Sequence, residues 1–142
     1  MKQMGFIGAG SMAEAMIKGL VKSGAMEPEA IFVTNQSNTA RLRELSETYG
    51  VCGEADTAKV AARSDTLVLA MKPKDAADGM AALRPYLRKD QLLISVLAGS
   101  TGKRAVKSFS RGFHSLSPLL VYYSSSLRLR SFTCIYLLFI ML

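Results

Sequence analysis

The sequence predicts an α/β fold in which a parallel sheet carries helices on both faces. Two observations predict it: short apolar runs of strand length alternate with amphipathic stretches of about ten residues, and a glycine-rich turn follows the first run. A length of 142 residues corresponds to about one domain, which argues against two large domains with an active site between them. The composition, 49% hydrophobic and 20% charged, excludes a wholly disordered or collagen-like chain.

The first 99 residues alternate between predicted strands and predicted helices. Strands are expected at residues 4–7, 30–34, 51–52, 66–71 and 91–97. Helices are expected from Ser11 to Gly24, at residues 38–49, around residues 56–63 and after Pro73. The first helix shows the clearest pattern, because its apolar residues recur at helical spacing: Met12, Met16, Ile17, Leu20 and Val21. Strands separated by helices in this way favour a parallel sheet covered on both faces.

A Gly-x-Gly-x-x-Ala segment joins the first strand to the first helix. It consists of Gly8, Ala9, Gly10, Ser11, Met12 and Ala13. Gly8 suits a tight turn, Gly10 lets the backbone approach a pyrophosphate, and Ala13 allows the helix to pack closely on the strand. The free N–H groups and the positive dipole end of the helix would then hold the phosphates. The segment predicts a dinucleotide site in a Rossmann-type fold; the alternative is a glycine-rich turn in an α/β protein that binds nothing.

The end of the second predicted strand indicates which dinucleotide is preferred. A site that prefers NAD usually places Asp or Glu there to accept a hydrogen bond from the ribose 2′-OH. Residues 34–38 read Thr-Asn-Gln-Ser-Asn and contain no carboxylate. These neutral groups, with Arg41 one turn further on, would tolerate a 2′-phosphate, so we expect NADP, with NAD possible. The alternative is that these residues only form a turn and a helix N-cap, as Ser and Asn commonly do.

Four separate segments, in the same order, resemble the N-terminal domain of the pyrroline-5-carboxylate reductase family. They are residues 5–13, 33–35, 70–73 and 95–99, and the resemblance covers about residues 3–99. That family makes proline by NAD(P)H-dependent reduction of the cyclic imine 1-pyrroline-5-carboxylate. The resemblance therefore implies an NAD(P)-dependent oxidoreductase that acts on a C=N bond, in proline biosynthesis. Gln36 departs from the pattern, because many relatives carry a basic residue at this position.

The resemblance also implies which residues contact the cofactor. The glycine segment, residues 8–13, would cradle the pyrophosphate, and Asn35, Gln36 and Ser37 would face the adenosine ribose. The segment that leaves the fourth strand would lie in the ligand crevice of the sheet; it consists of Ala70, Met71, Lys72 and Pro73. Small side chains at Ala98 and Gly99 would let the nicotinamide ring approach the fifth strand. Two alternatives stay open, a solvated loop lysine at Lys72 and plain strand termination at residues 98–99.

Residues 100–142 differ in composition from the rest of the chain. They contain six of the 18 Lys and Arg residues and no acid, whereas residues 1–99 balance twelve bases against eleven acids. The net charge of +7 therefore belongs to the tail. We expect a dinucleotide-binding domain at residues 1–99 and a basic, Ser- and aromatic-rich tail of irregular structure at residues 100–142. A shifted reading frame would be one physical origin of such a tail.

In the pyrroline-5-carboxylate reductase family, a second, all-helical domain holds the imino-acid substrate and forms the dimer. Nothing after Gly99 matches that domain. We therefore expect this truncated chain to supply only the cofactor-binding part, with the catalytic residues unknown. The family's small imino-acid substrate is the implied partner, and the family's homo-oligomer is not expected here.

Other features argue against further function classes. Cys52 and Cys134 show neither a disulfide framework nor metal-ligand spacing, and no signal peptide is readable, so we expect a cytoplasmic protein without a metal. His114 is the only histidine and is expected to be incidental, since reduction of an electrophilic iminium needs no histidine base. The bases at residues 103–111 would contact nucleic-acid phosphates only nonspecifically. The apolar run at residues 132–142 is shorter than the ~20 residues of a membrane span.

Two hypotheses from different classes remain. The first is an NADPH-linked imine reductase of which this chain is the cofactor domain. The second is a catalytically silent NADP-binding module with a regulatory or partner-binding role. Turnover of NADPH with the cyclic imine would separate them.

Overall fold

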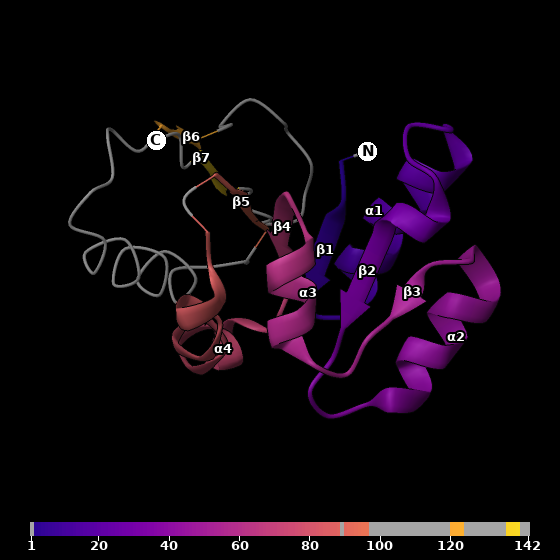
Figure 1. Ribbon diagram of the computed structural model, residues 1–142, viewed down its shortest axis with the longest axis horizontal. Coiled ribbons are helices and arrows are strands. Elements are labelled where there is room, and N and C mark those ends of the chain that lie inside the picture. The colour runs from indigo at the N-terminus through magenta and orange to yellow at the C-terminus, as the bar shows by residue number, and fades with distance from the viewer. Residues whose placement is uncertain (1, 89, 97–119, 124–135, 140–142) are drawn as a thin grey trace.

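The structure is a computed structural model, and it describes residues 2–88, 90–96, 120–123 and 136–139 (Figure 1). Within these residues one sheet has the strand order β3-β2-β1-β4-β5-β7-β6. Its first five strands are parallel, and they are β3 (Cys52–Gly53), β2 (Ile31–Thr34), β1 (Met4–Ile7), β4 (Thr66–Leu69) and β5 (Leu92–Ser95). This is the order of a Rossmann-type sheet, whose topological switch point lies where β1 and β4 are neighbours.

Helices cover both faces of the sheet. The helices α1 (Ser11–Lys22) and α2 (Thr39–Tyr49) lie on one face, and α3 (Thr57–Arg63) and α4 (Ala76–Leu83) lie on the other (Figure 1). Short 3-10 turns stand beside them: η1 (Pro28–Ala30), η2 (Pro73–Asp75) and η3 (Arg84–Tyr86). The predicted parallel sheet with flanking helices is therefore confirmed.

Alternate residues of each central strand supply two separate hydrophobic cores. On β1, Phe6 packs with the α1 and α2 side, whereas Ile7 packs with the α3 and α4 side. On β2, Val33 and Phe32 divide in the same way. Because a strand points successive side chains to opposite faces, a strand buried on both faces becomes a continuous apolar run. This explains why the sequence shows unbroken apolar runs at these strands.

Gly5 sets how closely α3 lies on the sheet. A Cβ atom at Gly5 would stand 2.7 Å from Val60 Cγ1 and 2.9 Å from Leu67 Cδ2, closer than real contacts allow. The missing side chain therefore lets α3 approach β1 directly. Gly24 ends the first helical segment as expected, since its φ of 67° is left-handed.

The strand boundaries differ slightly from those expected. Ala70 and Met71 lie beyond the end of β4, so the fourth strand is shorter than the predicted 66–71. The fifth strand is also shorter than predicted, and the third begins at Cys52 and includes Gly53. These are differences of one or two residues at strand ends, where assigned element boundaries commonly differ by this much.

Two short segments of the tail are strands rather than irregular. The strands β6 (Leu120–Tyr123) and β7 (Tyr136–Phe139) pair antiparallel with each other, and β7 pairs antiparallel with β5. Both are apolar four-residue runs with aromatic and branched residues, which favour the extended conformation. The predicted features at residues 98–99, at residues 103–111 and at His114 lie outside the described residues.

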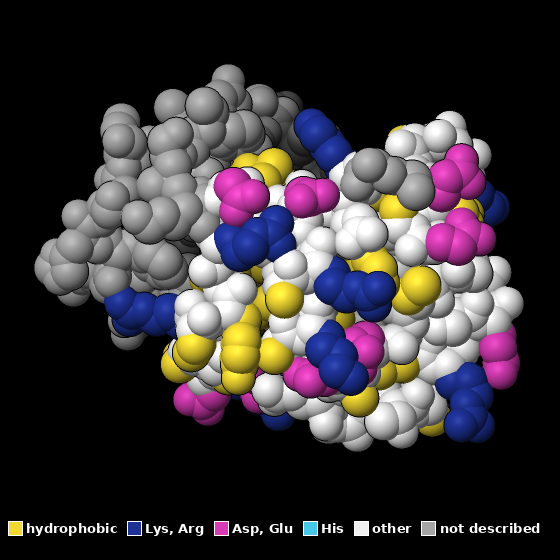
Figure 2. All heavy atoms as spheres, in the orientation of Figure 1, with side chains coloured by type: hydrophobic (Ala, Val, Ile, Leu, Met, Phe, Trp, Pro, Cys, Tyr) yellow, Lys and Arg dark blue, Asp and Glu magenta, His cyan; other side chains and the backbone are white. Residues whose placement is uncertain are grey.

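The surface of the α/β part mixes charges of both signs. Figure 2 shows Lys and Arg interspersed with Asp and Glu over one face of the molecule, and hydrophobic side chains gathered over α4. Among the described residues, no helix combines the length and the apolar character that a membrane crossing requires.

Candidate functional site

A groove of about 590 Å³ lies at the carboxyl ends of β1, β2 and β4. Parallel strands of open α/β sheets end together at one edge, and their ligands bind there. The groove brings together nine of the predicted site residues: Gly8, Ala9, Gly10, Asn35, Gln36, Ser37, Ala70, Met71 and Lys72. Residues that are 62 positions apart in the chain thus lie around one space.

The turn after β1 is built on Gly8. Its φ of 112° is one that side-chain-bearing residues rarely adopt, and a Cβ atom there would stand 2.7 Å from the carbonyl carbon and oxygen of Ala70. The Gly8 N–H donates to Thr34 O at 2.9 Å, and the Ala70 N–H donates to Ile7 O at 2.9 Å. The turn is therefore hydrogen-bonded to the end of β2, while the segment after β4 is bonded to the end of β1. Only glycine fits at this position.

Gly10 differs from Gly8, because its missing side chain faces open space. Gly10 is the N-cap of α1 with φ −81° and ψ −173°, and a Cβ atom there would meet no protein atom within 4 Å. No side chain caps the helix, so the N–H groups of its first turn have neither a cap nor an intrahelical acceptor. Bare amides at a helix N-terminus, beside a groove, fit a pyrophosphate.

The rest of the glycine segment supports this turn. Ala13 is fully buried, which agrees with close packing of α1 on the sheet. Ser11 is exposed, and Met12 is 37% exposed. The side chains of residues 11–13 are not part of the groove lining, so any contact of theirs to a phosphate would come from the backbone.

The turn after β2 carries no charge of its own. Asn38 caps α2, because its Oδ1 accepts from the Arg41 N–H at 3.0 Å, and Asn35 Oδ1 accepts from the Ser37 N–H at 3.4 Å. The turn-and-cap interpretation of these residues is thus confirmed for both asparagines. Capping does not remove them from the groove, because both residues line it.

Arg41 lines the groove and is held by three partners. Its Nε donates to Ala9 O at 3.2 Å, its Nη1 lies 2.8 Å from Glu44, and its Nη2 pairs with Glu14 of α1. The Tyr49 hydroxyl donates to the same Glu14 carboxylate at 3.0 Å. Two carboxylates therefore share the Arg41 guanidinium.

The titration of this cluster follows from its hydrogen bonds. The hydrogen bond from Arg41, and to a smaller extent the hydrogen bond from Tyr49, holds the pKa of Glu14 below its usual range. Hydrogen bonds with Glu44 and Glu14 raise the pKa of Arg41, so it stays fully charged. Burial is the main cause that raises the pKa of Tyr49, and the hydrogen bond to Glu14 raises it further. The Arg41 guanidinium and the Glu14 carboxylate are therefore both charged at neutral pH.

The segment after β4 brings two further cations to the groove. Lys72 and Lys74 are exposed and line it, and the Asp75 N–H donates to Lys72 O at 2.9 Å within the 3-10 turn that starts at Pro73. Met71 packs on α4, where a Cβ atom at Gly79 would stand 2.6 Å from its sulfur. Lining residues that the sequence did not mark as part of the site include Lys74, Asp75, Thr57 and Gly79. The first two directly follow the predicted segment and could have been found by extending it past Pro73.

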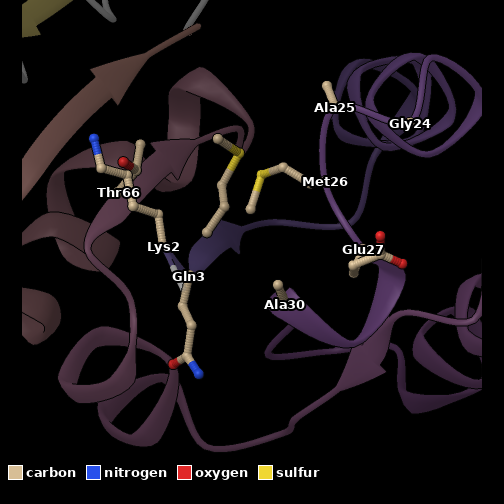
Figure 3. A pocket seen from close by; sticks show the side chains of 9 residues that line it. Lys2, Gln3, Gly24, Ala25, Met26, Glu27, Ala30 and Thr66 are labelled. Atoms are coloured by element: carbon tan, nitrogen blue, oxygen red, sulfur yellow. The ribbon is translucent and has the colours of Figure 1, made fainter.

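A smaller pocket of about 350 Å³ lies at the opposite end of the strands. Figure 3 shows Lys2, Gln3 and Met26 around it, with Thr66 at the start of β4. Gly24 lines it just after the carboxyl end of α1, and no α-helix of the described residues begins beside it. The carboxyl-end groove is therefore the one that suits a dinucleotide.

Comparison with known proteins decides the family. Residues 3–99 match the family model described as NADP oxidoreductase coenzyme F420-dependent. The chain belongs to this family. Within it, the chain is similar to pyrroline-5-carboxylate reductase 2 of Bacillus subtilis (strain 168), with 52% identity over 111 residues that make up 78% of this chain and 40% of that protein.

Solved structures agree with this assignment. A pyrroline-5-carboxylate reductase from Coxiella burnetii superposes with a TM-score of 0.67 at 32% identity, covering 76% of this chain and 39% of that one. The Plasmodium falciparum pyrroline carboxylate reductase with NADP bound shares the fold, with a TM-score of 0.60 at 24% identity over 74% of this chain and 38% of that one. The resemblance to the N-terminal part of these NADP oxidoreductases is thereby confirmed. The chain spans about 40% of the length of the relatives that it matches.

Proposed function

We propose that the chain binds NADP(H) in the carboxyl-end groove as the cofactor-binding part of a pyrroline-5-carboxylate reductase. The proposed reaction is the reduction of the cyclic imine 1-pyrroline-5-carboxylate to proline. The observation that carries the proposal is the turn at Gly10, where an uncapped helix start meets a groove that no side chain fills. The name of the Bacillus subtilis relative supports the substrate class.

Each wall of the groove has a part in this proposal. The first turn of α1 would hold the pyrophosphate through backbone N–H groups, and residues 35–37 would face the adenosine ribose. The segment 70–73 would lie along the dinucleotide, while residues 98–99 would approach the nicotinamide. The bound coenzyme would supply a hydride to the imine carbon. The protein's own task is to hold the donor at near-attack distance, a form of orientation that can supply about 7–11 kcal/mol of barrier lowering.

We propose NADP rather than NAD as the preferred coenzyme, with NAD tolerated. The turn after β2 presents no carboxylate, so nothing there would repel a 2′-phosphate or select a free 2′-hydroxyl. Lys72 and Lys74 add positive charge to the same groove. Coenzyme fluorescence titrations with NADPH and NADH test this preference, and clearly tighter binding of NADH would refute it.

A second candidate is binding of NADP(H) without turnover, in a regulatory or partner-binding module. It is favoured by the groove, where all nine predicted site residues are expected to contact the coenzyme. A steady-state assay with 1-pyrroline-5-carboxylate separates the two: oxidation of NADPH supports the reductase, and tight binding without oxidation supports the module. Binding of neither coenzyme would refute both.

We further propose that residues 1–99 form the dinucleotide-binding domain and that the protein is cytoplasmic. The free thiol of Cys52 suits a reducing compartment. Fractionation of expressing cells tests the location, and limited proteolysis followed by coenzyme titration tests the domain boundary.

A further inference from the structure

Arg41 is held in the groove wall by contacts that belong to three different parts of the fold. It stands in the first turn of α2, its Nε bonds to the carbonyl of Ala9 in the glycine turn, and its Nη2 bonds to Glu14 on α1. Ala9 lies 32 residues from Arg41, and Glu14 lies 27 residues from it. A planar guanidinium can hold several acceptors at fixed directions at once, which a lysine ammonium on a flexible stem does not do. Arg41 therefore ties the glycine turn and α1 to the start of α2.

The contact to Ala9 fixes the peptide bond that leads into the N-cap of α1. In a planar trans peptide the C=O of one residue and the N–H of the next point in opposite directions. Since Arg41 holds the Ala9 carbonyl, it also sets the direction of the Gly10 N–H. Gly10 is the position whose missing side chain leaves the groove open.

The charge of Arg41 is already matched inside the protein. Glu14 and Glu44 both pair with the guanidinium, and the Arg41 side chain is 21% exposed. A cation shared by two carboxylates has little charge left for an external phosphate, and releasing it would unpair both carboxylates. Lys72 and Lys74 also line the groove, and they form no ion pair within the part of the chain that the structure describes, so they carry its unmatched positive charge.

We propose that Arg41 is a positioning residue, which holds the Ala9–Gly10 peptide for the pyrophosphate that NADPH and NADH share, and that it does not read the 2′-phosphate. The proposal rests on the proposed function, since it concerns the same groove. It predicts that loss of Arg41 weakens both coenzymes together, whereas a 2′-phosphate ligand would affect NADPH alone.

The experiment compares R41M with R43M, which removes the same charge from the exposed face of the same helix. Dissociation constants for NADPH and NADH are measured by fluorescence titration. We expect R41M to weaken both coenzymes by about tenfold, the loss typical of a charge-assisted hydrogen bond. The ratio of the two constants, and all constants of R43M, should stay within about twofold of the unsubstituted chain.

Three further variants, one of them a control, complete the test. R41K keeps the positive charge but loses the planar guanidinium that reaches several acceptors at once, so it should bind both coenzymes as weakly as R41M. E14Q weakens the bond to α1 while leaving Arg41 in place, and E44Q is its matched control on the far side of the guanidinium. E14Q should weaken both coenzymes, and E44Q should weaken them less. Full recovery of binding in R41K, or loss of NADPH binding alone in R41M, would overturn the proposal.

Hydrogen exchange of the ligand-free chain provides a readout that does not depend on the coenzyme. The amides of Gly8 and Glu14 are bonded to Thr34 O and Gly10 O, so they report on the glycine turn, and Ser64 in the α3 cap serves as the control amide. We expect faster exchange at Gly8 and Glu14 in R41M and no change at Ser64. Unchanged exchange at all three would overturn the positioning role. If the unsubstituted chain bound neither coenzyme, the proposed function would fall, while this exchange comparison would still decide whether Arg41 holds the turn.

Discussion

Replacing Gly10 by alanine should separate coenzyme binding from folding. The backbone at Gly10, with φ −81° and ψ −173°, is extended and open to any residue, and the new Cβ would meet no protein atom within 4 Å. The fold therefore has no steric reason to reject the methyl group. Coenzyme binding in the groove has such a reason, because the methyl group would occupy the space beside the bare amides of α1.

The magnitudes follow from these two environments. Alanine is a poorer N-cap than glycine, but it also restricts the unfolded chain, so we expect the free energy of unfolding to change by less than about 1 kcal/mol. A methyl group that keeps a phosphate from the amides removes at least one charge-assisted hydrogen bond, which is worth about 1.5–3 kcal/mol. NADPH binding should therefore weaken by about tenfold or more.

The assay pairs urea unfolding with fluorescence titration, and G8A is the contrasting variant. A Cβ at Gly8 would press on the Ala70 carbonyl in a left-handed backbone conformation, so G8A should lose both stability and binding. If G10A bound NADPH as tightly as the unsubstituted chain, the phosphates would not lie at this turn, and the reasoning would be refuted.

Three other substitutions test the fold, the coenzyme preference and the titration of the Arg41 cluster. G5A should lower the free energy of unfolding by about 1–3 kcal/mol in urea, because its methyl overlaps Val60 and Leu67; a neutral effect would show that α3 is not closely packed there. Q36R adds a cation beside residues 35 and 37 and should raise the preference for NADPH over NADH by about fivefold, with an unchanged ratio arguing against a ribose at this turn. E14Q should be less stable than the unsubstituted chain at neutral pH, and this difference in the free energy of unfolding should shrink in acid. The pKa of Glu14 is lower in the folded chain than in the unfolded chain. The stabilisation by the Glu14 carboxylate is therefore complete above the ordinary carboxyl pKa and is lost as the pH falls through the pKa of the folded state. A stability difference that did not change with pH would contradict that shift.

The parts of the site that the sequence could predict are those with local signals. The helix after Gly10 follows from apolar spacing, and the turn at Gly8 follows from glycines placed directly after a buried strand. The exit of β4 could be placed at the same edge because parallel strands share their carboxyl end. Each of these inferences needs only residues that are close in the chain, together with the general geometry of a parallel sheet.

The contacts around Arg41 could not be predicted in the same way. Glu14 and Tyr49 lie 35 residues apart and meet only because α1 and α2 pack side by side on one face of the sheet. From the sequence alone Arg41 had the character of a free cation near a phosphate. Glu14, on another helix, gave no signal as its partner, whereas Glu44 lies three residues further along the same helix, a spacing at which side chains can pair. Thr57 and Gly79 were missed for the same reason, since they reach the groove from helices of the opposite face. The strands β6 and β7 were missed because the tail shows no alternation of strand-length runs with helical stretches, whereas the equally short β1 and β2 are each followed by a predicted helix.

The positive character of the groove arises from folding rather than from composition. Residues 1–99 are nearly balanced, with twelve bases against eleven acids, yet the groove lining contains Arg41, Lys72 and Lys74 and only one carboxylate, Asp75. The N-terminal dipole of α1 adds further positive potential at the same place. Charges act mainly within a Debye length of about 8 Å at physiological salt, so this local arrangement affects an approaching dinucleotide more than the net charge of +7 does. With the charge of Arg41 largely matched by Glu14 and Glu44, the unmatched positive charge of the groove lies on the two lysines after β4.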